Sequence, residues 1–160
     1  MNLDDFLLLV RDLNATGKEQ IDKEMFKLAN SLLIEFSKAP QAWQVVFEVL
    51  EMGISDQNPL NVSDNEMMQA AIILKNKFMF DFVALKSQQL QFGQDAATVT
   101  IQMRDKMMGL VQSLARPLKS TGKPAPRFIL NVVCTSVAYF SMHAHPYWPT
   151  LIGDLANSLA

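Results

Sequence analysis

The stretch that decides the fold is Gln69–Phe82, which reads Gln-Ala-Ala-Ile-Ile-Leu-Lys-Asn-Lys-Phe-Met-Phe-Asp-Phe. A capping box, Ser63-Asp64-Asn65-Glu66, opens it, because the Ser63 hydroxyl and the Glu66 carboxylate can each accept from the other residue's amide. Beyond this cap the apolar side chains form two neighbouring rows and leave only a thin polar strip. The rows are Met67, Ala71, Leu74, Phe78 and Phe82, then Met68, Ile72, Met79 and Val83. The pattern predicts a helix packed on both flanks, as in the inner layer of a stack of helix pairs.

Composition narrows the class of protein. The chain has 160 residues, 49% of them hydrophobic, and a formal net charge of −2, which lacks the basic excess of a nucleic-acid binder. The single cysteine, Cys134, permits no internal disulfide and fits a reducing compartment. Asp4 and Asp5 precede any apolar run, so a secretory signal is not expected. The uncharged run between Arg127 and His143 is too short and too polar to cross a bilayer.

Helical periodicity recurs along the chain, without strand-like alternation or hairpin signals. Short and long helices alternate, at roughly 2–14 with 17–38, 40–52 with 63–86, and 95–118 with 124–143, followed by a lone helix from 146. We therefore predict an all-α fold, an α-α superhelix (α-solenoid) of about three HEAT-like helical hairpins plus one terminal helix. The repeats would span about 2–38, 40–86 and 95–143, with a fourth beginning at 146–160. Together they would form one domain over 1–160, which we expect to be a fragment of a longer chain.

Local signals set the expected boundaries. Thr16-Gly17-Lys18-Glu19 is a second capping box, and the helix after it carries two apolar rows, so it too is predicted to be packed on two sides. Ala39-Pro40 ends that helix, Gly53 is expected as the C′ residue of the next, and Asp95 is expected as an N-cap.

Two segments resemble the N-terminal region of the importin-β superfamily, the karyopherins. One is Ala42-Trp43, followed after a loop by an alanine-rich helix that contains Leu74-Lys75-Asn76-Lys77-Phe78. The other runs from Ile129 to Tyr139 and is followed by Trp148 and Leu151, similar to a third inner helix and the tryptophan of the next repeat. The likeness covers nearly the whole chain in layout, although the chain is less acidic than such proteins usually are.

The resemblance implies a nuclear transport receptor. Such receptors hold the GTP form of the GTPase Ran on the inner helices of their first repeats, hold cargo proteins further along the arch, and dock nucleoporins on the outer surface. They shuttle through the nuclear pore between cytoplasm and nucleus, and contact neither nucleic acid nor membrane directly. Residues of two polar strips then become candidate Ran contacts. They are Gln69, Lys75, Asn76 and Lys77 on the second inner helix, and Lys23, Lys27 and Asn30, beside Ser31, on the first.

Each candidate has a simpler interpretation. The lysines can be an ordinary solvated strip, and Asn76 can bond a loop carbonyl that holds neighbouring repeats in register. Trp43 and Trp148 are expected to anchor one repeat to the next. Phe92, in a loop, is the aromatic residue that fits no predicted core and could contact a nucleoporin or cargo. A generic HEAT-repeat protein-interaction scaffold that never binds Ran is the alternative function.

Catalysis is not expected. His143 and His145, with only Cys134 about two turns upstream, provide too few ligands for zinc. Cys134 lies in the most apolar predicted helix, where it is expected to be an inert hydrophobic residue. Gly122-Lys123-Pro124 lacks the spacing of a phosphate-binding loop. We therefore predict no enzyme, no cofactor and no metal.

Overall fold

The computed structural model describes residues 1–15, 23–84, 95–118, 122–144, 146 and 148–160. Over these residues the chain is all-α, as predicted, and the only β pairing is an isolated bridge between Pro117 and Pro124. The helices are α1 (Leu3–Ala15), α2 (Lys23–Lys38), α3 (Ala42–Gly53), α4 (Asp64–Phe80), α6 (Ala96–Ala115), α7 (Arg127–Ala144) and α8 (Leu151–Leu159).

Two of the predicted caps form. Ser63 caps α4 in a complete capping box with Glu66, and the Asp95 carboxylate caps α6 by accepting from the Thr98 amide at 2.7 Å. These bonds satisfy amides that have no partner within the first helical turn. The Thr16–Glu19 capping box, Phe92 and His145 lie outside the described residues.

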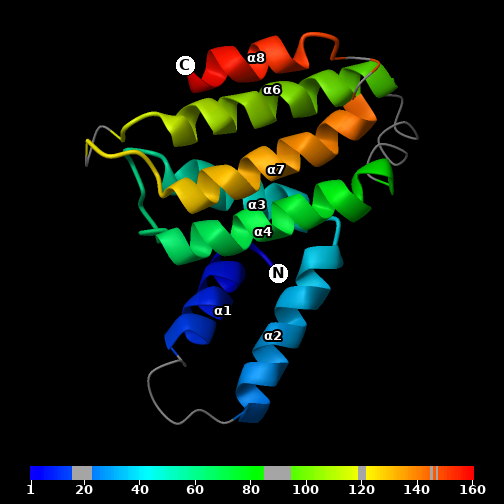
Figure 1. Ribbon diagram of the computed structural model, residues 1–160. Coiled ribbons are helices and arrows are strands. Elements are labelled where there is room, and N and C mark those ends of the chain that lie inside the picture. Colours follow the sequence, from blue (N-terminus) through cyan, green and yellow to red (C-terminus); the bar gives the residue numbers. More distant parts are fainter. Residues whose placement is uncertain (16–22, 85–94, 119–121, 145, 147) are drawn as a thin grey trace.

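Helix α4 occupies the centre of the molecule (Figure 1). It packs most extensively against α7 and α3, while α6 packs on α7 and α8 packs on α6. The first apolar row of the predicted pattern is buried throughout, at Met67, Ala71, Leu74, Phe78 and Phe82. The second row is only half-buried, and Val83 at its end is exposed. The prediction that α4 is packed on two flanks is confirmed, because α3 and α7 cover it on both sides.

Aromatic side chains join the central helices. Trp43 at the start of α3 meets Phe78 of α4 edge-on, with ring centroids 5.0 Å apart. Phe78 contacts Phe140 of α7 at 5.3 Å, and Phe140 contacts Trp148 at 5.8 Å. Aromatic pairs at these separations add to the free energy of apolar burial. Trp43 and Trp148 therefore anchor α3 and the segment before α8 to the same core. The expected role of Trp43 differs, because its ring contacts lie on α4 and at Phe82, within the same predicted repeat.

Helix α2 departs from the prediction of two-sided packing. Only Leu33 and Phe36 are buried, and the helix leads away from the body of the molecule together with α1 (Figure 1). Apolar residues of its first turns are exposed, among them Met25 and Leu28. The prediction is wrong because an amphipathic pattern shows which side of a helix is apolar but not whether another element reaches it.

Two predicted boundaries are also wrong. Gly53 is the last residue of α3 rather than its C′ residue, and within the described residues Gly122 is the glycine with a positive φ. What Gly53 provides is space, since a Cβ there would lie 2.6 Å from Met67 Cγ. Helix α8 begins at Leu151 instead of residue 146, because Pro149 disfavours a helical conformation at the residue before it.

Candidate functional site

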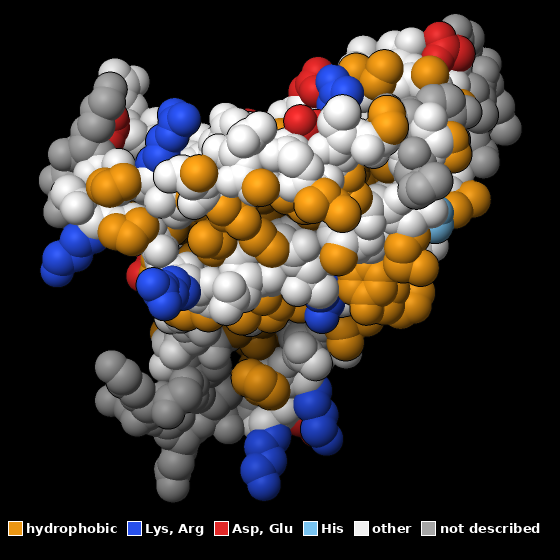
Figure 2. Space-filling view, turned by 45° about the horizontal axis from the view of Figure 1, so that its top comes forward, with side chains coloured by type: hydrophobic (Ala, Val, Ile, Leu, Met, Phe, Trp, Pro, Cys, Tyr) orange, Lys and Arg blue, Asp and Glu red, His pale blue; other side chains and the backbone are white. Residues whose placement is uncertain are grey.

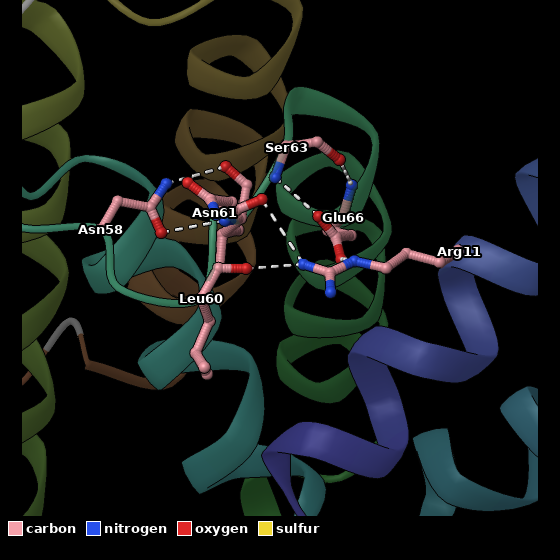
Figure 3. Close-up of polar contacts among 7 residues, drawn as sticks. Arg11, Asn58, Leu60, Asn61, Ser63 and Glu66 are labelled. Carbon is pink, nitrogen blue, oxygen red and sulfur yellow. Dashed lines mark hydrogen bonds and ion pairs between the residues drawn. The ribbon is translucent and has the colours of Figure 1, made fainter.

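The candidate site is built on α4, whose first turn is held by the capping box (Figure 3). The Ser63 amide donates to Glu66 Oε2 at 2.6 Å, and the Glu66 amide donates to Ser63 Oγ at 3.4 Å. The Glu66 side chain is only 1% exposed. A buried carboxylate needs a positive partner or several donors to offset its desolvation.

Arg11 of α1 is that partner (Figure 3). Its Nε lies 2.6 Å from Glu66 Oε1, and its Nη2 donates to the Leu60 carbonyl at 2.7 Å and to the Asn61 carbonyl at 3.4 Å. One guanidinium therefore joins α1, the loop before α4 and the first turn of α4. Asn61 has a left-handed φ of 49°, a conformation that asparagine tolerates better than most residues.

The loop itself is closed by a second side chain. Asn58 donates from Nδ2 to the Val62 carbonyl at 3.0 Å and accepts from the Val62 amide at Oδ1 at 2.9 Å. These bonds form a local closed ring that fixes the loop directly before the Ser63 cap. The start of α4 is therefore held by Arg11 of α1 and by the loop that Asn58 closes.

Lys77 does not lie on the exposed polar strip that the sequence predicted for it. It is 2% exposed, and its Nζ donates to the Ala39 carbonyl at 2.8 Å and to Asp81 Oδ2 at 2.9 Å. The same Nζ lies 6.0 Å from the centroid of the Trp43 ring. Lys77 thus ties the end of α4 to the turn between α2 and α3, and its ammonium is not available to a partner protein. The expectation of a surface contact at Lys77 is wrong, because helical geometry places it on the buried side with Glu66 and Ala70.

Gln69 and Asn76 share one row of α4, seven residues apart, and both are partly exposed. Lys75 lies about 100° around the helix from Asn76, beside the half-buried Met68 and Met79. Of the four residues predicted to form an exposed strip on α4, only Gln69 and Asn76 lie together at the surface. Lys75 lies on a different side of the helix, and Lys77 is buried.

Asn76 also lines a crevice between the ends of α2 and α4. The crevice has a volume of about 370 Å³ and is lined by Ser37, Lys38, Asn76, Phe80 and Asp81. Phe80 is 73% exposed and follows Asn76 by one turn. Exposed aromatic side chains such as Phe80 are of the type enriched in protein interfaces. Sequence reasoning did not single out Phe80 or Lys38, although Phe80 belongs to neither apolar row and lies in line with Gln69 and Asn76.

The candidates on α2 are exposed but lie elsewhere. Lys23, Lys27 and Asn30 recur at spacings of four and three residues, so they share one side of the helix. Because only the end of α2 approaches α4, its first turns lie away from the row of Gln69 and Asn76 (Figure 1). The structure brings the end of α2 to Asn76, and it separates Lys23 and Lys27 from it.

Asp95, Asp154 and Cys134 lie outside the surfaces of α4 and α2 that carry the candidate contacts, and hydrogen bonding or burial shifts the pKa of each. Two hydrogen bonds from Thr98 lower the pKa of Asp95, the α6 cap. Hydrogen bonds from the Trp148 indole and the Thr150 hydroxyl lower the pKa of Asp154. Burial raises the pKa of the Cys134 thiol, which disfavours the reactive thiolate.

Among the described residues, no group of three or more His, Cys, Asp or Glu side chains is arranged to hold a metal ion. No helix in this part of the chain combines the length and the apolar character needed to cross a membrane.

Comparison with known proteins gives one informative match. The chain is 31% identical over 102 residues to an uncharacterized protein of Schizosaccharomyces pombe, which corresponds to 63% of this chain and 10% of that protein. The match thus spans about a tenth of the relative's length. No protein-family model matches the chain, and no solved structure matches it.

Proposed function

We propose that this chain is the N-terminal part of a HEAT-like helical-repeat nuclear transport receptor, and that its α4 face binds the GTPase Ran in the GTP form. In this proposal α3 with α4 and α6 with α7 are successive helical hairpins. α4 and α7 form the inner layer, and α8 begins the next hairpin. The observation that carries the proposal is the position of α4, which is packed by α3 and α7 but leaves one row of side chains open.

The chemistry of that open row supports protein binding. Gln69 and Asn76 provide amide donors and acceptors, and Lys38 provides a cation at the crevice. Phe80 provides an exposed aromatic group, a residue type enriched in protein interfaces. One side of the first turns of α2 carries Lys23 and Lys27, which remain candidate contacts separate from this row.

The proposed mechanism is conformational coupling. Each unit of a helical array contacts only its neighbours, so small rotations between hairpins add up along the chain. Binding of Ran-GTP at one end would then change affinity for cargo elsewhere, and cargo would affect Ran-GTP equally. The contacts between α4 and α7 are where such a rotation would occur within the described residues.

Binding to Ran loaded with GTP or with GDP tests the proposal. Biolayer interferometry should extend to about 100 μM, since a single small contact face binds weakly. We expect binding to the GTP form alone, reduced at least several-fold by Asn76→Ala and by Phe80→Ala. Arg116→Ala, on an exposed residue at the end of α6, is the control and should bind like the parent chain.

A helical scaffold that binds other proteins but not Ran is the second candidate. The absence of a match to any family model or solved structure is the observation that keeps it open. A folded chain that ignores both nucleotide forms of Ran would favour this function. Binding that is equal for the two forms would do the same, because a transport receptor must distinguish them.

A further inference from the structure

Two buried charged side chains of α4 bond to the hairpin that α1 and α2 form. Glu66 is 1% exposed and Lys77 is 2% exposed. They are eleven residues apart, about three helical turns, so they lie on nearly the same side of α4. Glu66 pairs with Arg11 of α1, and Lys77 donates to the carbonyl of Ala39, the residue after α2. The first hairpin is therefore tied to α4 near both ends of that helix.

The two ties differ in the apolar packing that accompanies them. Helix α1 adds three buried apolar side chains, whereas the described residues of α2 add two, Leu33 and Phe36, both in its last two turns. The earlier turns of α2 extend away from the body. Figure 2 shows this projection from a second direction, with lysine side chains standing out from α2 below the body. The direction of α2 therefore depends strongly on how its last turn is held.

The Lys77 bond lies beside the crevice between α2 and α4. One wall of the crevice is Ser37 and Lys38, the last two residues of α2, and Ala39 follows them directly. The other wall lies on α4 and includes Asp81, the second acceptor of the Lys77 ammonium at 2.9 Å. One buried ammonium thus joins the two walls.

We propose that Lys77 is a positioning residue for this crevice. Its buried side chain touches no partner, but by holding the Ala39 carbonyl it fixes the direction of α2 and the separation of Lys38 from Asn76. The inference rests on the proposed function, in which the crevice belongs to the protein-binding face. Groups held in their bound arrangement beforehand lose less freedom on binding. Loss of the Lys77 ammonium should therefore weaken binding although no contacting side chain changes.

Double electron–electron resonance measures the direction of α2 without any partner. Spin labels at Lys27→Cys on α2 and Asn65→Cys on α4 occupy exposed positions, and Cys134→Ala removes the native thiol. Position 27 lies about 18 Å along the helix from Ala39, so a tilt of about 10° moves it by about 3 Å. The parent should give one narrow distance distribution. Lys77→Met should shift or broaden it by about this amount.

Binding to Ran-GTP, followed by biolayer interferometry on the unlabelled chain, is the second measurement. Lys77→Met should weaken it several-fold. Gly53→Ala is the matched control, because it disturbs packing at Met67, at the other end of α4 from the crevice. It should keep the distance distribution and the affinity of the parent. Lys77→Leu, with the same expected results, is a second variant in case Lys77→Met folds poorly, and circular dichroism checks the fold of each.

The two measurements separate failure of this inference from failure of the proposed function. An unchanged distance distribution in Lys77→Met would overturn the inference, whatever binds the crevice. A changed distribution with unchanged affinity for Ran-GTP would also overturn it, as would an equal loss of affinity in Gly53→Ala. If the parent chain does not bind Ran-GTP, the proposed function fails, while a changed distribution still supports Lys77 as the residue that positions the crevice walls.

Discussion

Replacement of Lys77 tests whether a buried ammonium stabilises this fold. In Lys77→Met the side-chain stem is largely kept, but the bonds to the Ala39 carbonyl and to Asp81 are lost. The bond to the Ala39 carbonyl is worth about 1.5 kcal/mol as a charge-assisted hydrogen bond. The Asp81 pair adds about 0.5 kcal/mol, since the Asp81 side chain is 37% exposed and is well solvated on its own.

The net effect is smaller than the lost contacts, because Met does not require an ammonium to be desolvated. The Ala39 carbonyl also keeps a second donor, the Ala42 amide at 3.1 Å. We therefore expect Lys77→Met to lower the free energy of unfolding by about 1–2 kcal/mol. Lys77→Ala additionally loses buried methylene groups worth about 0.8 kcal/mol each, which brings its cost to about 3–4 kcal/mol.

Urea denaturation monitored by circular dichroism measures both values. In thermal melts each kcal/mol should lower Tm by about 2–4 °C for a chain of this size. Lys75→Met, two residues away and partly exposed, is the matched control and should stay within about 0.5 kcal/mol of the parent. If Lys77→Met proved as stable as the parent, the ammonium would contribute nothing net, and the proposed tie between α4 and the α2–α3 turn would be refuted.

Three further results are expected, two from glycine replacements and one from acid titration. Gly53→Ala should cost about 1–3 kcal/mol, because its methyl group would overlap Met67. Gly109→Ala, mid-helix with open space around it, should stabilise by about 0.5–1 kcal/mol in the same denaturation assay, and a stabilised Gly53→Ala would contradict the reasoning. Hydrogen bonds lower the pKa of Asp154 in the folded chain, so its contribution is present above the ordinary carboxyl pKa and is lost as pH falls through the lower, folded value. Trp148 fluorescence should therefore change in acid below the normal aspartate range, and Asp154→Asn should remove that step.

The sequence predicted the local features of α4 because local chemistry decides them. The Ser63 cap needs only Glu66, three residues away, and the buried row needs only the 3.6-residue period of the helix. Arg11, the partner of Glu66, could not be identified in this way, because 55 positions of chain separate the two residues. Contacts of that kind depend on how helices pack, which no short pattern encodes.

Lys77 is a different case, because its burial could have been inferred. Helical periodicity places Lys77 in line with Glu66, Ala70 and Ile73, on a side of α4 that faces the core. The prediction placed Lys77 at the surface because its side chain is charged, but its angular position on the helix buries it. On α2 the opposite error occurred, since apolar residues were assigned to a core that does not extend to them.

The Arg11–Glu66 ion pair makes α1 necessary for the stability of α4, although the two helices are far apart in the sequence. A shortened chain that starts after residue 15 would take the guanidinium away from the Glu66 carboxylate, and the Leu60 carbonyl would lose its donor as well. Such a truncation would loosen the first turn of α4, although it removes no residue of that helix. Expression boundaries and amino-terminal fusions for this protein therefore need to retain α1 intact.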